Sequence, residues 1–142
     1  MKVIISMLAL FTSTFLLAQT DVVVEVTNLR SDKGQIIISF FEDEQSFDNE
    51  QPSMNKVFRK KAVKNGKLYL KFSVPSGSYG LSFVDDENSN DELDYNFIGM
   101  PTEGFGFSNH YHTGMSKPDL SQFKIKVKPG KSNKVKCKIR YM

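Results

Sequence analysis

A two-residue alternation of apolar and polar side chains is the feature that most restricts how this chain can fold. Val22, Val24 and Val26 occupy every second position near the start, and an apolar–basic alternation recurs in residues 123–128 and 133–141. This period places successive side chains on opposite faces of a β-strand, so that each strand has one face to bury. Because no segment after residue 18 shows an amphipathic helical pattern of useful length, the sequence predicts an all-β protein.

Turn-forming residues divide the chain into seven predicted strands. Asn65-Gly66 is the strongest signal, because both residues tolerate the positive φ of a type I′ hairpin turn. Ser31–Gly34 and Pro129-Gly130 are further turn clusters. The expected hairpins pair residues 22–28 with 35–41, 57–63 with 68–72, and 123–128 with 133–141. Residues 80–84 are predicted to form the seventh strand. Together these segments predict a seven-stranded antiparallel β-sandwich.

The motif Pro75-Ser76-Gly77-Ser78-Tyr79 resembles the P-x-G-x-Y corner of prealbumin-like and other immunoglobulin-like β-sandwiches. Proline ends one strand, glycine permits the turn, and tyrosine begins the next strand. The resemblance implies that the Tyr79 ring packs under the turn and that its hydroxyl bonds nearby backbone.

Residues 1–18 are predicted to be a secretory signal peptide. The chain begins Met1-Lys2, continues with an apolar run over residues 3–17, and reaches the small residue Ala18 before a polar segment. Cleavage after Ala18 or after Gln19 fits the pattern. We therefore expect a single exported domain at residues 19–142, periplasmic or extracellular, with no transmembrane segment once the leader is removed.

The single cysteine, Cys137, cannot form an internal disulfide even though export leads to an oxidising compartment. It alternates with Lys136 and Lys138, which places it on the apolar face of a strand. We expect it to be a small, inert core residue.

The basic residues are concentrated at the C-terminal end. The last hairpin is expected to present one lysine-rich face that could meet an anionic glycan or lipid headgroups. The alternative is that these lysines keep a solvated sheet edge from pairing with other chains. Nucleic acid is an unsuitable partner for an exported chain with no nucleic-acid-binding motif.

Residues 85–109 are predicted to form one long, ordered loop. The segment is rich in acidic, amide and glycine residues, and loops of this length in compact domains usually carry function or are disordered. Its apolar content favours order. The apolar residues are Phe97, Ile98, Met100, Phe105 and Phe107.

Oxygen-bearing residues alternate along this loop in the manner of a calcium site. The candidate ligands are Asp86, Asn88, Asn90, the backbone carbonyl of Glu92, and Asp94. Asp91 stands where an EF-hand needs glycine and Phe97 where it needs glutamate, so only a looser calcium loop is predicted. Repulsion between neighbouring carboxylates favours a counter-ion. The alternative is an Asx-rich turn whose side chains bond their own backbone amides.

The run from Asp86 to Asn109 resembles the signature of an uncharacterised exported bacterial family, domain of unknown function 2141. Its pattern is D-E-N-x-N-x-x-L-D-x-N-x-x-G-x-P-x-E-G-x-G-F-S-N. N-L-R-S-x-K-G at residues 28–34 and the P-x-G-x-Y corner extend the similarity. Histidine is usual in the family where this chain has Asp85, and glycine where it has Ser89 and Asp91. The resemblance implies a secreted sandwich domain and no established activity.

Two classes of function remain open on the sequence. A metal-dependent or hydrolytic enzyme would use Glu103, His110 and His112, because a His-x-His pair and a carboxylate resemble a zinc site. No other catalytic motif supports this reading.

A non-enzymatic binding or envelope-associated module is the preferred reading. Its partner would be a glycan or an envelope protein. The alternative is that the aromatic residues cover the loop's own core. The predicted binding residues are Glu103, Phe105, Phe107, Asn109 and Tyr111.

Overall fold

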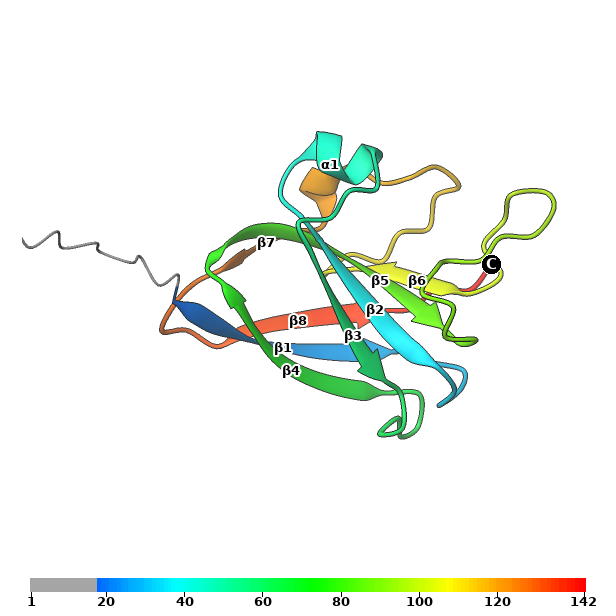
Figure 1. Ribbon diagram of the computed structural model, residues 1–142, viewed down its shortest axis with the longest axis horizontal. Coiled ribbons are helices and arrows are strands. Elements are labelled where there is room, and N and C mark those ends of the chain that lie inside the picture. The colour runs from blue at the N-terminus through cyan, green and yellow to red at the C-terminus, as the bar shows by residue number, and fades with distance from the viewer. Residues whose placement is uncertain (1–17) are drawn as a thin grey trace, which may run out of the picture.

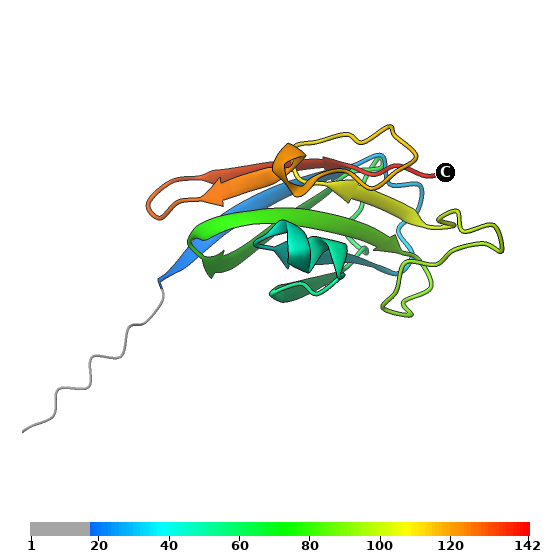
Figure 2. The same ribbon diagram turned by 90° about the horizontal axis from the view of Figure 1, so that it is seen from above.

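The computed structural model describes residues 18–142, and these form two β-sheets packed face to face (Figure 1; Figure 2). The predicted signal peptide, apart from Ala18, lies outside the described residues. The all-β sandwich prediction is confirmed, with eight strands in place of seven. The strands are β1 (Gln19–Thr27), β2 (Gln35–Phe41), β3 (Met54–Arg59), β4 (Leu68–Pro75), β5 (Gly77–Asp86), β6 (Gly104–Phe107), β7 (Lys124–Val127) and β8 (Asn133–Lys138).

One sheet has the order β4-β1-β8, and the other has the order β3-β2-β5-β6 with β7 also paired to β5. β7 and β6 share one side of β5, at Gly77–Gly80 and at Ser82–Asp85 respectively. All pairings between these strands are antiparallel except that of β1 with β8, which is parallel. The prediction of a wholly antiparallel sandwich is therefore corrected at this one pair.

All three predicted hairpins are wrong in their pairing. β1 and β2 lie in different sheets, and so do β3 and β4, and β7 and β8. The turns themselves were recognised correctly: Asn65 and Gly66 both have positive φ, and Lys64 and Lys67 form a two-residue bridge around them. The bridge does not extend into a ladder, because β3 and β4 continue into opposite layers. Consequently the lysines of β7 and β8 do not share one face.

The main core lies between the sheets, where the alternating apolar residues meet. Val22, Val24 and Val26 are fully buried, and Cys137 is buried beside them, as predicted. Burial raises the pKa of the Cys137 thiol, which keeps it protonated and unreactive. The corner prediction is also confirmed, because the Tyr79 hydroxyl donates to the Pro75 carbonyl oxygen at 3.0 Å.

A second, aromatic cluster covers the outer face of the larger sheet. Helix α1 (Glu44–Asp48) and the 3-10 turn η1 (Leu120–Gln122) fold over β5, as Figure 1 shows. Its buried residues are Phe41, Phe47, Phe107, Leu120 and Phe123. Gly80 makes room for them, since an added Cβ there would meet Phe123 at 2.7 Å. Within residues 18–142, no helix has the length and apolar character needed to cross a membrane.

The predicted loop over residues 85–109 is shorter than expected. Asp85 and Asp86 end β5, and Gly104–Phe107 is β6. The glycines of β6 face the main core, where β8 passes so close that a Cβ on Gly106 would lie 2.5 Å from the Cys137 sulfur. The loop between these strands spans residues 87–103, and it extends from the end of the sandwich at which the chain terminates (Figure 1; Figure 2).

Candidate functional site

A buried ion pair lies at the end of the sandwich beneath the loop. Asp85 follows Leu81 and Phe83 at inward-facing positions of β5, so its carboxylate enters the core. Lys60 donates to it from the end of β3 at 2.5 Å, and both side chains are fully buried. The Tyr141 hydroxyl donates to the other carboxylate oxygen at 2.5 Å. Burial, followed by the hydrogen bond to Asp85, raises the pKa of Tyr141, so its proton stays on the phenol.

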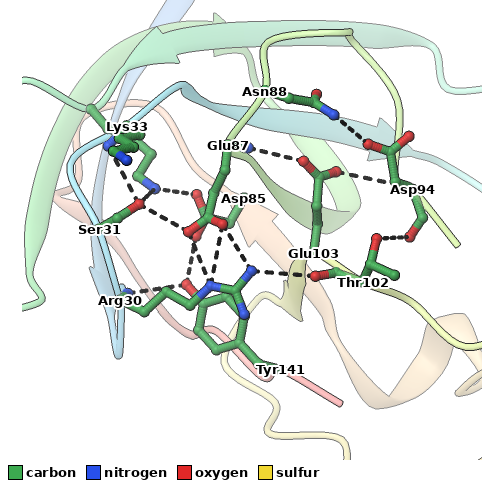
Figure 3. A network of polar contacts seen from close by, with 11 residues as sticks. Arg30, Ser31, Lys33, Asp85, Glu87, Asn88, Asp94, Thr102, Glu103 and Tyr141 are labelled. Atoms are coloured by element: carbon green, nitrogen blue, oxygen red, sulfur yellow. Dashed lines mark hydrogen bonds and ion pairs between the residues drawn. The ribbon is translucent and has the colours of Figure 1, made fainter. Parts of the chain in front are cut away.

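Glu87 extends this network toward the surface (Figure 3). Arg30 binds both Glu87 carboxylate oxygens, with the shortest bond at 2.8 Å, and Ser31 donates to Glu87 at 2.9 Å. The guanidinium also lies 4.4 Å from the Tyr141 ring centroid. The hydrogen bond from Arg30 is the main cause that lowers the pKa of Glu87. The β1–β2 connection is therefore tied to the start of the loop.

Asp86 organises the first turn of the loop. Its buried carboxylate accepts the backbone N–H groups of Asn90 and Asp91 at 3.1 and 2.9 Å. Gln35 donates to the same carboxylate at 2.8 Å, and to Asp91 at 2.7 Å. Gly34 is required beside them, because any side chain there would collide with the backbone of Asp86 and Glu87.

Glu103 closes the loop from its other end. Its two oxygens accept the backbone N–H groups of Glu87 at 3.1 Å and Asp94 at 3.3 Å, as Figure 3 shows. Burial is the main cause that raises the pKa of Glu103. One carboxylate thus holds both the beginning and the middle of the loop in place.

The predicted calcium residues are engaged in hydrogen bonds with one another. The Asp94 carboxylate accepts the side-chain amides of Asn88 at 2.6 Å and Asn90 at 2.7 Å. The Asn88 oxygen accepts the N–H of Asn90, and the Asn90 oxygen accepts the N–H of Glu92. These are the contacts of the Asx-turn alternative. In the described part of the chain, no three His, Cys, Asp or Glu side chains are grouped so as to hold a metal ion.

The tip of the loop, residues 95–101, is an ordered apolar turn. Tyr95 and Pro101 form a β-bridge, and the Asn96 side chain accepts the backbone N–H groups of Ile98 and Met100 at 3.1 and 3.0 Å. The Phe97 side chain is 100% exposed, Ile98 is 67% exposed, and Tyr95 is 57% exposed. This exposed group was not among the predicted binding residues.

The predicted binding residues are divided between core and surface. Phe107 is buried in the aromatic cluster, and Phe105 packs against it half-buried. Asn109 exchanges hydrogen bonds with Lys136 on β8, through its backbone N–H and its side-chain oxygen. Tyr111 is 45% exposed, with the Lys138 ammonium 4.6 Å from its ring centroid. Only Tyr111 of the aromatic residues predicted for binding is thus largely accessible.

The residues predicted for catalysis are not brought together. His110 and His112 lie near one another, with ring centroids 5.9 Å apart. His112 faces the Ser116 carbonyl oxygen at 2.5 Å. Glu103 precedes β6 and the histidines follow it, and the strand between them is about 13 Å long at 3.3 Å per residue. Among residues 18–142 these three side chains do not form a group that could hold a metal ion.

Sequence reasoning missed Lys60, Arg30 and Tyr141. Lys60 stands between Arg59 and Lys61, and such a basic run is typical of a solvated surface. Asp85 carried a usable signal, because it continues the inward register of Leu81 and Phe83. A carboxylate in that register requires a buried partner.

A family model described as an uncharacterised protein conserved in bacteria, DUF2141, matches residues 24–136. No curated protein and no solved structure matches the chain.

Proposed function

The chain belongs to the DUF2141 family of uncharacterised bacterial proteins, and we propose that it is an exported, non-enzymatic binding module of the cell envelope. The loop tip, residues 95–101, is the surface that binds the partner. The observation that carries the proposal is the complete exposure of Phe97 on a turn whose backbone is already ordered.

Exposed apolar residues on an ordered turn favour binding for two reasons. Covering the Phe97 and Ile98 side chains removes apolar surface from water, which is favourable at roughly 25 cal/mol per Å². The turn needs little further ordering on association, because the tip backbone and the Asn96 side chain already hold it. The tip therefore has the character of a preformed anchor.

The chemistry of the tip favours an envelope protein over a glycan. The rings of Tyr95 and Phe97 could stack on a sugar, but the exposed aliphatic side chain of Ile98, next to Phe97 in the chain, suits an apolar protein pocket better than a sugar hydroxyl. Acidic residues, including Glu92 and Asp94, precede the tip. A partner with an apolar pocket and a basic rim would complement this surface.

The test is a paired substitution at the tip. The mature wild-type protein, tagged at the C terminus, is crosslinked in its native cell envelope, and the captured proteins are compared with those captured by a Phe97→Ser/Ile98→Ser variant. A specific envelope protein lost by the variant, and retained by a Val57→Ser control at another exposed apolar site, is expected. Equal capture by all three proteins would contradict the proposal.

Calcium stays a prediction for the same loop. Binding would require Asn88 and Asn90 to turn their amide oxygens toward an ion held by Asp86 and Asp94. Saturating calcium at a hundred times its dissociation constant would add about 2.7 kcal/mol of stability. The thermal midpoint should then rise by several degrees over a chelated sample, and Asp94→Ala should abolish the rise. An unchanged midpoint would leave the hydrogen bonds alone as the stabilising contacts of the loop.

A further inference from the structure

We propose that the outer face of the three-stranded sheet β4-β1-β8 is a second binding surface, which takes an anionic polysaccharide. This inference is independent of the proposed function, because it concerns a different sheet face and a different class of ligand. We call it the lysine–tyrosine face and define it by Lys71, Lys134, Lys136 and Lys138 together with Tyr69 and Tyr111.

The lysines of β8 form a regular row of positive charge. Lys134, Lys136 and Lys138 are all exposed and alternate with the buried Val135 and Cys137. Because a strand rises about 3.3 Å per residue, the Cα atoms of neighbouring lysines in this row are about 7 Å apart. Among the ion pairs of residues 18–142, none involves these three lysines.

The strand register extends the row into a two-dimensional face. Lys71 on β4, whose ammonium pairs with Asp21 of β1 at 3.2 Å, and Lys134 on β8 both lie opposite Val23 of the central strand. Tyr69 and Lys136 both lie opposite Glu25. Neighbouring strands are about 4.8 Å apart, so each of these pairs spans about 10 Å across the sheet.

Two exposed tyrosine rings lie on this face or at its edge. Tyr69 is 64% exposed in the middle of β4. Tyr111 lies near the side of β8 that does not pair with β1. Hydrogen bonds between Asn109 and Lys136 hold its segment there, and the Lys138 ammonium lies over its ring. Exposed rings beside a row of cations suit a ligand that has both apolar ring faces and negative charge.

A polysaccharide that carries carboxylates matches this combination better than lipid headgroups do. Sugar rings can stack on Tyr69 and Tyr111, their carboxylates can meet the lysines, and their hydroxyls can donate to Glu25. A lipid surface would use the lysines and leave Glu25 facing anionic phosphates at the centre of the face, which is unfavourable.

The experiment measures retention of the mature protein on immobilised alginate, a polymer of uronic acids, against immobilised neutral dextran. Wild-type protein should bind alginate selectively, and the affinity should fall as salt is raised. Lys134→Gln/Lys136→Gln/Lys138→Gln should weaken binding at least tenfold. Tyr69→Ser should weaken it several-fold at every salt concentration, because stacking is less sensitive to screening.

A charge-matched variant controls for non-specific attraction. Lys61→Gln/Lys64→Gln/Lys126→Gln removes the same charge from exposed lysines outside this face and should change the affinity less than twofold. Equal losses in the two triple variants, or no preference for alginate over dextran, would overturn the proposal. So would binding to phosphatidylglycerol vesicles in place of alginate. The Phe97→Ser/Ile98→Ser variant should bind alginate normally, which separates this result from that of the loop tip.

Discussion

Charged side chains usually lie at the protein surface, but those of Lys60 and Asp85 are fully buried in contact with each other. Each would carry a desolvation cost that its partner and Tyr141 offset. Such a pair contributes less net stability than its short distance suggests. Removing one partner is strongly destabilising, because the other charge is then left in the core without compensation.

We expect Lys60→Met to lower the free energy of unfolding by about 3 to 5 kcal/mol, because Asp85 stays buried without its cation. Denaturant titration measures the change. Lys71→Met is the matched control, since it breaks the exposed pair with Asp21 and should have little effect. A second substitution, Asp85→Leu, should restore much of the loss in the Lys60→Met background. Equal stability of Lys60→Met and wild type would contradict the buried contact.

Glu87 makes the stability of the loop base dependent on pH. Its pKa in the folded protein is lowered from the ordinary value of 4.5, chiefly by the hydrogen bond from Arg30. A lowered folded-state pKa contributes stability that is present above the unfolded value and is lost as the pH falls through the folded value. Glu103 has the opposite effect on the pH dependence of stability, because its pKa in the folded protein is raised.

The expected result is that Glu87→Gln flattens the acid side of the stability profile. Wild type should lose more stability than the variant as the pH is lowered from 6 to 3, and the two profiles should run parallel above pH 6. Unfolding midpoints in denaturant, measured at each pH, test this. Identical acid slopes for the two proteins would show that Arg30 does not influence the titration of Glu87.

At the scale of elements, β6 shows how a glycine-rich segment becomes a strand. Phe105 and Phe107 face the aromatic cluster, whereas Gly104 and Gly106 face β8. The close approach allows Phe105 and Arg140 to exchange two backbone hydrogen bonds, at 3.0 and 2.8 Å. β6 therefore links the two sheets along one side of the sandwich.

Gly106→Ala should destabilise the protein by about 1 to 3 kcal/mol, because the added methyl group overlaps the Cys137 sulfur. A double-mutant cycle with Cys137→Ala separates this overlap from other effects. The loss caused by Gly106→Ala should be smaller in the Cys137→Ala background. Additive losses would place the strain elsewhere.

At the scale of the whole molecule, β8 is the strand on which both layers depend. It pairs with β1 in one sheet, and the residues after it bond to β6 of the other. Its cysteine faces the interior between the layers. The thiol is therefore exposed to solvent only when the two sheets separate, and its reactivity should report global unfolding.

We expect Cys137 to be unreactive toward a thiol-specific reagent in the native protein and to react as the protein unfolds in denaturant. Burial and the raised pKa of the thiol both suppress its reaction. A Ser132→Cys variant supplies an exposed second thiol, which should react at once while Cys137 stays silent. Rapid labelling of native wild-type protein would be inconsistent with a closed sandwich.

Local patterns in the sequence determined which residues form most strands, where the chain turns, and which side chains enter the core. The Val22–Val26 alternation, the Asn65-Gly66 turn, the Tyr79 corner and the burial of Cys137 are all properties of short segments. Each is set by backbone preferences and by a period that acts over a few residues.

Strand pairing and the burial of the charged pair depend on contacts between distant segments. A two-residue period specifies the face of a strand but not its neighbour, so adjacent strands entered opposite sheets. Lys60 and Asp85 meet because β3 and β5 flank β2 in one sheet. The sequence did not reveal β6 for the same reason, since glycines are favoured in this strand only because β8 passes close to it. These contacts join distant segments, and their free energy exists only once the two layers pack.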